Sequence, residues 1–132
     1  MPPLGITGYA FNRTRQAYLA TRLSVAGTHW SRLCGLIFTD TAKFRRGDGL
    51  WIVPSHGVHT LAMQFPIDVI YLDADKIVVH TERNLRPWRI AKVSGRTASV
   101  LELPGSTLNS TGTAVGDEIE ITVGRPQEPV TA

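Results

Sequence analysis

The chain has 132 residues, of which 42% are hydrophobic and 19% are charged, and its formal net charge is +3. This composition is typical of a single globular domain and excludes a disordered chain. No apolar run reaches the ~18 residues that a membrane helix needs. The first residues lack the cationic start and apolar core of a secretory signal, so we expect a cytoplasmic protein. The single cysteine, Cys34, has no partner for an internal disulfide, and we expect it to be buried.

Residues 1–15 are predicted to form a partly disordered N-terminal arm. Residues 16–26 then alternate, with Leu19 and Leu23 on the same face, which predicts one half-buried strand. From Thr28 onward the apolar spacing changes to three and four residues. This spacing predicts a short helix that Thr28 caps and Gly35 ends. Its apolar face comprises Trp30, Leu33, Cys34 and Ile37.

Short apolar runs between turn residues predict further strands at 50–53, 67–72, 77–80, 99–103 and 118–123. The acidic turn at 73–76 joins two of them into a hairpin, and residues 106–110 have room for one helical turn. We therefore expect a mostly β fold: a single-domain antiparallel β-sandwich or jelly-roll-like barrel with one or two short helices. This domain spans residues 16–124, and residues 125–132 form a disordered tail.

Six segments in a fixed order resemble the domain-of-unknown-function 192 family. They are CGLIF at 34–38, GDGLWIV at 47–53, HTLAMQFPIDVIYLD at 59–73, RPWR at 86–89, VLELPGST at 100–107 and VGDEIEI at 115–121. The resemblance implies a small β-sandwich or jelly-roll-like barrel from a mostly bacterial and archaeal family, and it implies no established reaction. The chain departs from the family pattern at Lys76, where a turn glycine is usual after Asp75.

The segment at residues 56–73 concentrates unusual residue types for a strand. His59 and Asp68 could form an acid–base or orienting pair. Alternatively Asp68 accepts backbone N–H groups and His59 is a satisfied strand residue. Met63 either packs in the core or adapts to a ligand. His56 and His59 lie three residues apart in a loop without a third ligand at a diagnostic spacing, so we expect no metal and no cofactor.

A second cluster is basic and contains one aromatic residue, Trp88, within residues 83–96. Trp88 and Arg89 could stack a ring and hold a phosphate or carboxylate. Alternatively the charges protect an edge strand from pairing with another chain. A further basic run at residues 43–46 is predicted to be a solvated loop. An inward-facing Glu102 would need a partner such as Arg22 or Arg89, because burial of a lone carboxylate is costly.

The leading functional hypothesis is a binding module for a small polar or anionic ligand such as a saccharide. Its predicted site comprises His59, Met63, Asp68, Trp88 and Arg89. One alternative is a cofactor-independent hydrolase or isomerase that uses Asp68 and His59. Another is a protein-interaction module that offers an edge strand to a partner. Nucleic-acid binding has the least support because the net charge is low, no membrane association is expected, and the oligomeric state is left open.

Overall fold

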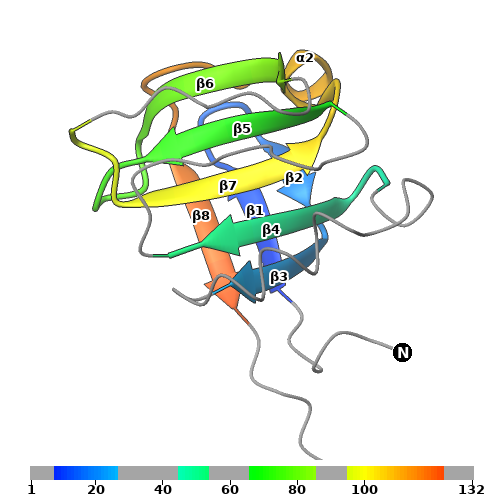
Figure 1. Cartoon of the computed structure of the whole chain (residues 1–132), viewed down its shortest axis with the longest axis horizontal. Coiled ribbons are helices and arrows are strands. Elements are labelled where there is room, and N and C mark those ends of the chain that lie inside the picture. The colour runs from blue at the N-terminus through cyan, green and yellow to red at the C-terminus, as the bar shows by residue number, and fades with distance from the viewer. Residues whose placement is uncertain (1–7, 27–44, 54–65, 86–94, 124–132) are drawn as a thin grey trace, which may run out of the picture.

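The computed structural model describes residues 8–26, 45–53, 66–85 and 95–123. These ranges form two sheets and one short helix (Figure 1). The smaller sheet has the order β2-β1-β8 and the larger sheet has the order β3-β4-β7-β5-β6. The elements are β1 (Gly8–Asn12), β2 (Ala17–Ala20), β3 (Arg22–Ala26), β4 (Asp48–Ile52), β5 (Ile67–Leu72), β6 (Val78–Leu85), β7 (Ser99–Pro104), α2 (Thr107–Thr111) and β8 (Ile119–Val123).

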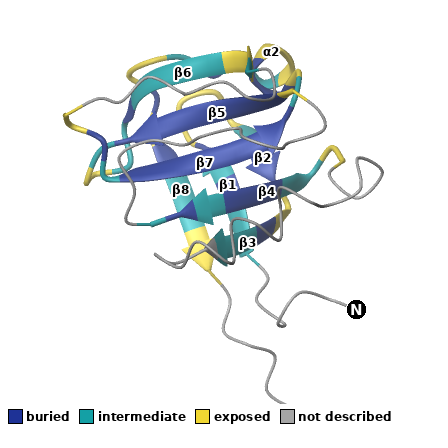
Figure 2. Ribbon diagram, viewed as in Figure 1, coloured by how far each residue is buried: buried dark blue, intermediate teal, exposed yellow. Residues whose placement is uncertain are grey.

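The hydrophobic core lies between the two sheets (Figure 2). Ala10 and Ile119 enter it from the small sheet, and Ile70, Leu101 and Leu103 enter it from the large sheet. Two sheets that share one core confirm the predicted mostly β fold. The described strands do not close into a barrel, and a jelly-roll winding stays a prediction.

The described strand pairs are antiparallel except for β3 and β4, which run parallel. The expected antiparallel arrangement therefore agrees with the other described pairs and is wrong at this one. Parallel neighbours need a crossover of a dozen or more residues, and residues 27–47 are numerous enough to supply one.

The predicted single strand at residues 16–26 is also wrong, because the chain changes sheet at Thr21. The amides of Thr21 and Arg22 both donate to the Gly47 carbonyl, each at 2.8 Å. Residues before this bend belong to β2 in the small sheet, and residues after it belong to β3 in the large sheet. Leu19 and Ala20 are both buried, and Thr21 and Arg22 are both exposed, so the two-residue alternation breaks at the crossing.

The segment predicted as an N-terminal arm contains β1, the middle strand of the small sheet. It pairs antiparallel with both β2 and β8. Asp117 joins the end of β1 to the turn before β8. Its Oδ2 accepts hydrogen bonds from Asn12 Nδ2 at 2.9 Å, Arg15 Nε at 2.9 Å and the Ala114 amide at 3.0 Å. Burial alone would raise the pKa of Asp117, but these hydrogen bonds and the Arg15 charge lower it below its ordinary value.

The predicted hairpin of β5 and β6 is confirmed. Asp73 Oδ1 accepts the amides of Asp75 at 2.8 Å and Ile77 at 2.9 Å, and Lys76 adopts a left-handed φ of 61°. The predicted helical turn after β7 is confirmed as α2. The helix predicted to begin at Thr28 lies outside the described residues. Among the described helices, none has the length and apolarity needed to cross a bilayer.

Candidate functional site

The candidate site lies on the outer face of the large sheet, which we define as the face turned away from the small sheet. Strand alternation assigns Glu102 to this face, because Leu101 and Leu103 on either side of it belong to the core. Glu102 pairs in register with Leu50 on β4 and with Val69 on β5. Residues directly opposite one another share a face, so apolar side chains flank the carboxyl on both neighbouring strands.

The Glu102 carboxyl is fully buried, with 0% of the residue exposed. Neither of its oxygens has a hydrogen-bond partner among the described residues. Burial raises the pKa of Glu102 from 4.5 to about 8. At neutral pH the carboxyl is therefore mainly protonated, and it offers one proton donor together with acceptor oxygens.

The sequence suggested Arg22 or Arg89 as the partner of Glu102. Arg22 Nε instead bonds Asp48 Oδ1 at 2.6 Å, so the first suggestion is wrong. Arg89 lies outside the described residues.

Further polar groups share the outer face on the two strands beyond β7. Tyr71 on β5 is fully buried, and its hydroxyl has no partner in the described part of the chain. Its ring contacts the His80 ring edge-on at 5.1 Å between centroids. His80 Nε2 lies 3.0 Å from Glu82 Oε2. Burial, followed by the charges of Glu82 and Glu102, raises the pKa of the Tyr71 hydroxyl. The arrangement is thus an apolar face with a few placed polar groups on three adjacent strands.

Asp68 lies on the opposite, inner face, where it pairs in register with Leu103. Its side chain is buried, and each of its oxygens accepts a backbone amide: Oδ1 from Asn84 at 2.9 Å and Oδ2 from Leu108 at 2.8 Å. Asp68 therefore holds the start of α2 against an irregular point of β6, where Asn84 has a positive φ of 50°. This geometry agrees with the structural alternative for Asp68.

The other predicted site residues fall outside the described residues. They are His59, Met63, Trp88 and Arg89. Whether they share a surface with one another stays a prediction. Tyr71, His80 and Glu82 were not predicted to form a group. The predicted hairpin did not carry this signal, because Tyr71 comes opposite His80 only through a register shift between Tyr71 and Leu72. Among the described residues, no group of three or more metal-ligating side chains is close enough to hold an ion.

The fold and this face define a class: a small two-sheet β protein with a buried polar cluster on its larger sheet. The chain belongs to the DUF192 family, described as uncharacterized ACR, whose model matches residues 10–121. The predicted family resemblance is therefore confirmed. A UPF0127 protein of Thermococcus sibiricus is 30% identical over 114 residues, which cover 83% of this chain and 71% of that protein.

Two solved structures resemble the fold. One is a protein of unknown function from Novosphingobium aromaticivorans, with a TM-score of 0.70, 21% identity, and coverage of 86% of this chain and 82% of that chain. The other is a proposed transcription regulator from Sinorhizobium meliloti, with a TM-score of 0.69, 20% identity, and coverage of 86% and 91%. At these identities the similarity supports the fold alone.

Proposed function

We propose that the protein is a binding module for a small polar ligand that occupies the outer face around Glu102. The observation that carries this proposal is a fully buried carboxyl without a hydrogen-bond partner among the described residues. Leaving a buried polar group unpaired costs ~1–3 kcal/mol. Such groups are uncommon in folded proteins, and each one calls for an explanation. A ligand that pairs with Glu102 would recover this free energy on binding.

The ligand class follows from the groups on the face. The protonated Glu102 carboxyl and the Tyr71 hydroxyl both donate and accept hydrogen bonds. Ligand hydroxyl groups do the same, so a saccharide or polyol suits the face better than an anion. Trp88 and Arg89 remain proposed as groups that could stack and hold a ring, and His59 and Met63 remain proposed contributors. Asp68 is left out, because it lies on the inner face and both of its oxygens accept backbone amides. Because Glu102 is fully buried, binding requires a rearrangement of this face, and association should be slower than diffusion.

The test is thermal unfolding at pH 7 with a panel of sugars, polyols and organic acids. A ligand that binds only the folded state stabilises it by ~2.7 kcal/mol at a hundredfold excess over its Kd. We expect one hydroxylated class to raise the Tm of the native protein and of the control Glu118→Gln, which changes an exposed carboxylate immediately before β8. The rise should be lost in Glu102→Leu. A rise that survives in Glu102→Leu would refute the proposed site, and a flat panel would favour interaction through an edge strand.

A second candidate function is a cofactor-independent hydrolase or isomerase. The observation that favours it is the Glu102 carboxyl with a pKa of about 8, because a general acid works best with a pKa near the operating pH. Glu102 would then replace the predicted Asp68, whose oxygens are both engaged by backbone amides. Incubation with the ligand found in the panel, followed by NMR of the ligand, tests this function. Conversion that Glu102→Gln abolishes supports an enzyme, and recovery of unchanged ligand rejects it.

A further inference from the structure

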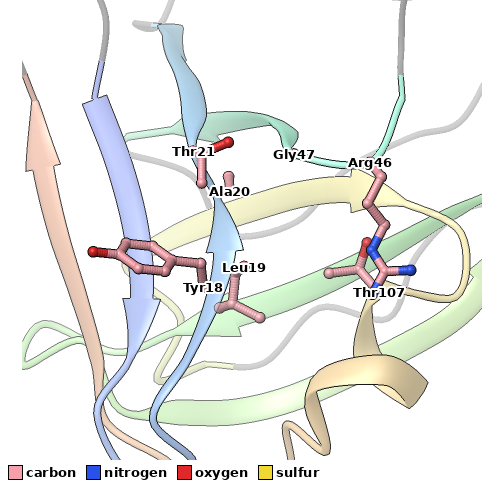
Figure 3. Close-up of a pocket in the computed structure, with 7 residues that line it drawn as sticks. All are labelled: Tyr18, Leu19, Ala20, Thr21, Arg46, Gly47 and Thr107. Atoms are coloured by element: carbon pink, nitrogen blue, oxygen red, sulfur yellow. The ribbon is translucent and has the colours of Figure 1, made fainter.

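A hollow of about 270 Å³ lies beside β2, at the corner where the chain passes between the sheets. Figure 3 shows residues of β2 on one side of it and the side chains of Arg46 and Thr107 on the other. The full lining is Tyr18, Leu19, Ala20, Thr21, Arg46, Gly47 and Thr107. None of these residues belongs to the outer-face site around Glu102, so the hollow is a separate feature.

The backbone that carries Arg46 is held by several polar contacts. Arg22 Nη2 donates to the Arg46 carbonyl at 2.8 Å, while Arg22 Nε binds Asp48. Asp48 Oδ2 also accepts the Arg45 amide at 2.9 Å. Gly47 has a φ of 96°, and a Cβ there would lie 3.1 Å from Thr21 Oγ1. The corner therefore has a defined backbone and little room for a side chain at position 47.

The charge at this corner is uneven. Arg22 and Asp48 pair with each other. The Arg45 and Arg46 side chains are exposed, and no described carboxylate forms a salt bridge with either of them. Of these two arginines, Arg46 is the one that lines the hollow. A guanidinium offers a planar fork of donors that matches the oxygens of a carboxylate or a phosphate.

We propose that this hollow binds a small anion, a carboxylate or phosphate group, through the guanidinium of Arg46. β2, which lines one side of the hollow, is an edge strand that pairs only with β1 in the described sheets, and the adjoining Thr21 amide already donates to the Gly47 carbonyl. The Thr107 hydroxyl donates to the Pro104 carbonyl at 2.7 Å, so its proton is not available to the anion. Binding therefore depends mainly on Arg46 rather than on the threonine.

The test is an NMR titration of the isotope-labelled full chain with sodium acetate and, separately, inorganic phosphate at constant ionic strength. The amides of Leu19, Thr21, Gly47 and Thr107 report on the hollow. We expect saturable shifts at these amides with at least one probe, and a Kd at least tenfold weaker in Arg46→Gln. Preference for acetate would identify a carboxylate ligand, and preference for phosphate would identify a phosphorylated one.

The matched control is Arg45→Gln, which removes the same charge from the adjacent exposed residue. It should change the Kd by less than twofold, and Arg46→Lys should give an intermediate loss because the charge stays and the fork is absent. Equal weakening in Arg45→Gln and Arg46→Gln would show a general positive field and overturn the proposal. Shifts that never saturate, or that spread over the surface without including the hollow, would overturn it as well.

Discussion

Replacing Glu102 by glutamine tests the buried carboxyl directly. Glutamine keeps the shape of a protonated glutamate but does not ionise. The pKa of Glu102 in the folded protein is about 8, against 4.5 for an ordinary glutamate. Between these values the unfolded chain has released the proton and the folded protein has kept it. Stability is then greatest below pH 4.5 and falls as the pH rises towards 8.

The magnitude follows from the width of this pH interval. Each pH unit between the two pKa values removes about 1.4 kcal/mol of unfolding free energy. Over the whole interval the loss approaches about 5 kcal/mol, a large share of the ~5–15 kcal/mol that stabilises a typical domain. Glu102→Gln should lack this dependence. The variant should be nearly as stable as the native protein at pH 5 and more stable by several kcal/mol at pH 8.

The assay is urea unfolding of both proteins at four pH values between 5 and 8. The difference between the two curves isolates Glu102 from every other titrating group. Parallel curves would refute the reasoning, because they would show that Glu102 titrates alike in the folded and unfolded chains. A variant that is ~3–5 kcal/mol less stable at pH 7 would refute it in another way, by revealing an ionised carboxylate with a charged partner.

Four other substitutions test features of the fold. Asp117→Asn should cost about 2–3 kcal/mol of unfolding free energy at pH 7 by weakening its three hydrogen bonds. The loss should shrink at acidic pH, because Asp117 stabilises the fold only while it is ionised, which requires a pH above its lowered pKa. A loss in urea unfolding that does not depend on pH would contradict this. Gly49→Ala should cost about 1–3 kcal/mol, because the new Cβ would lie 2.8 Å from Ala20 Cβ; an unchanged Tm would show that β4 can shift. Lys76→Gly should stabilise the hairpin by less than about 1 kcal/mol, because glycine adopts the left-handed φ of this position without strain. A lower Tm would mean that the loss of the Lys76 side-chain contacts outweighs this gain. Asp68→Asn should cost about 2–3 kcal/mol of unfolding free energy in urea. The rise in Tm that a bound ligand causes should stay unchanged in this variant, and loss of that rise would show that Asp68 does contribute to the binding site.

The sequence predicted the elements that are determined by residues close to one another in the chain. The hairpin of β5 and β6 followed from two apolar runs around an acidic turn, and Asp73 indeed organises that turn. The change of sheet at Thr21 could not be predicted, because its cause is the carbonyl of Gly47, which is distant in sequence. β1 was missed because five residues with a weak alternation gain their stability from β2 and β8 rather than from their own pattern.

The site shows the same division between local and distant causes. The sequence alone indicated that a buried Glu102 would need a partner. It could not show that Arg22 is engaged by Asp48, since that pairing depends on the parallel register of β3 and β4. The grouping of Glu102 with Tyr71 depends likewise on which strand lies beside β7. Strand order in a sheet is a property of the whole fold, and periodicity within one segment carries no information about it.

The pairing of β1 with β8 also affects how the protein is made. Tyr9 and Glu120, which are hydrogen-bonded at 2.5 Å, are 111 residues apart in the chain. At ~5–20 residues per second, a ribosome adds this length in roughly 5 to 20 s. Until then β1 can pair only with β2 among its two sheet neighbours. Within the β1–β2 pair, the Tyr18 ring contacts the rings of Tyr9 and Phe11, with centroids 5.8 Å and 4.8 Å apart. These three aromatic residues therefore lie where their contacts favour a β1–β2 hairpin before β8 has been synthesised.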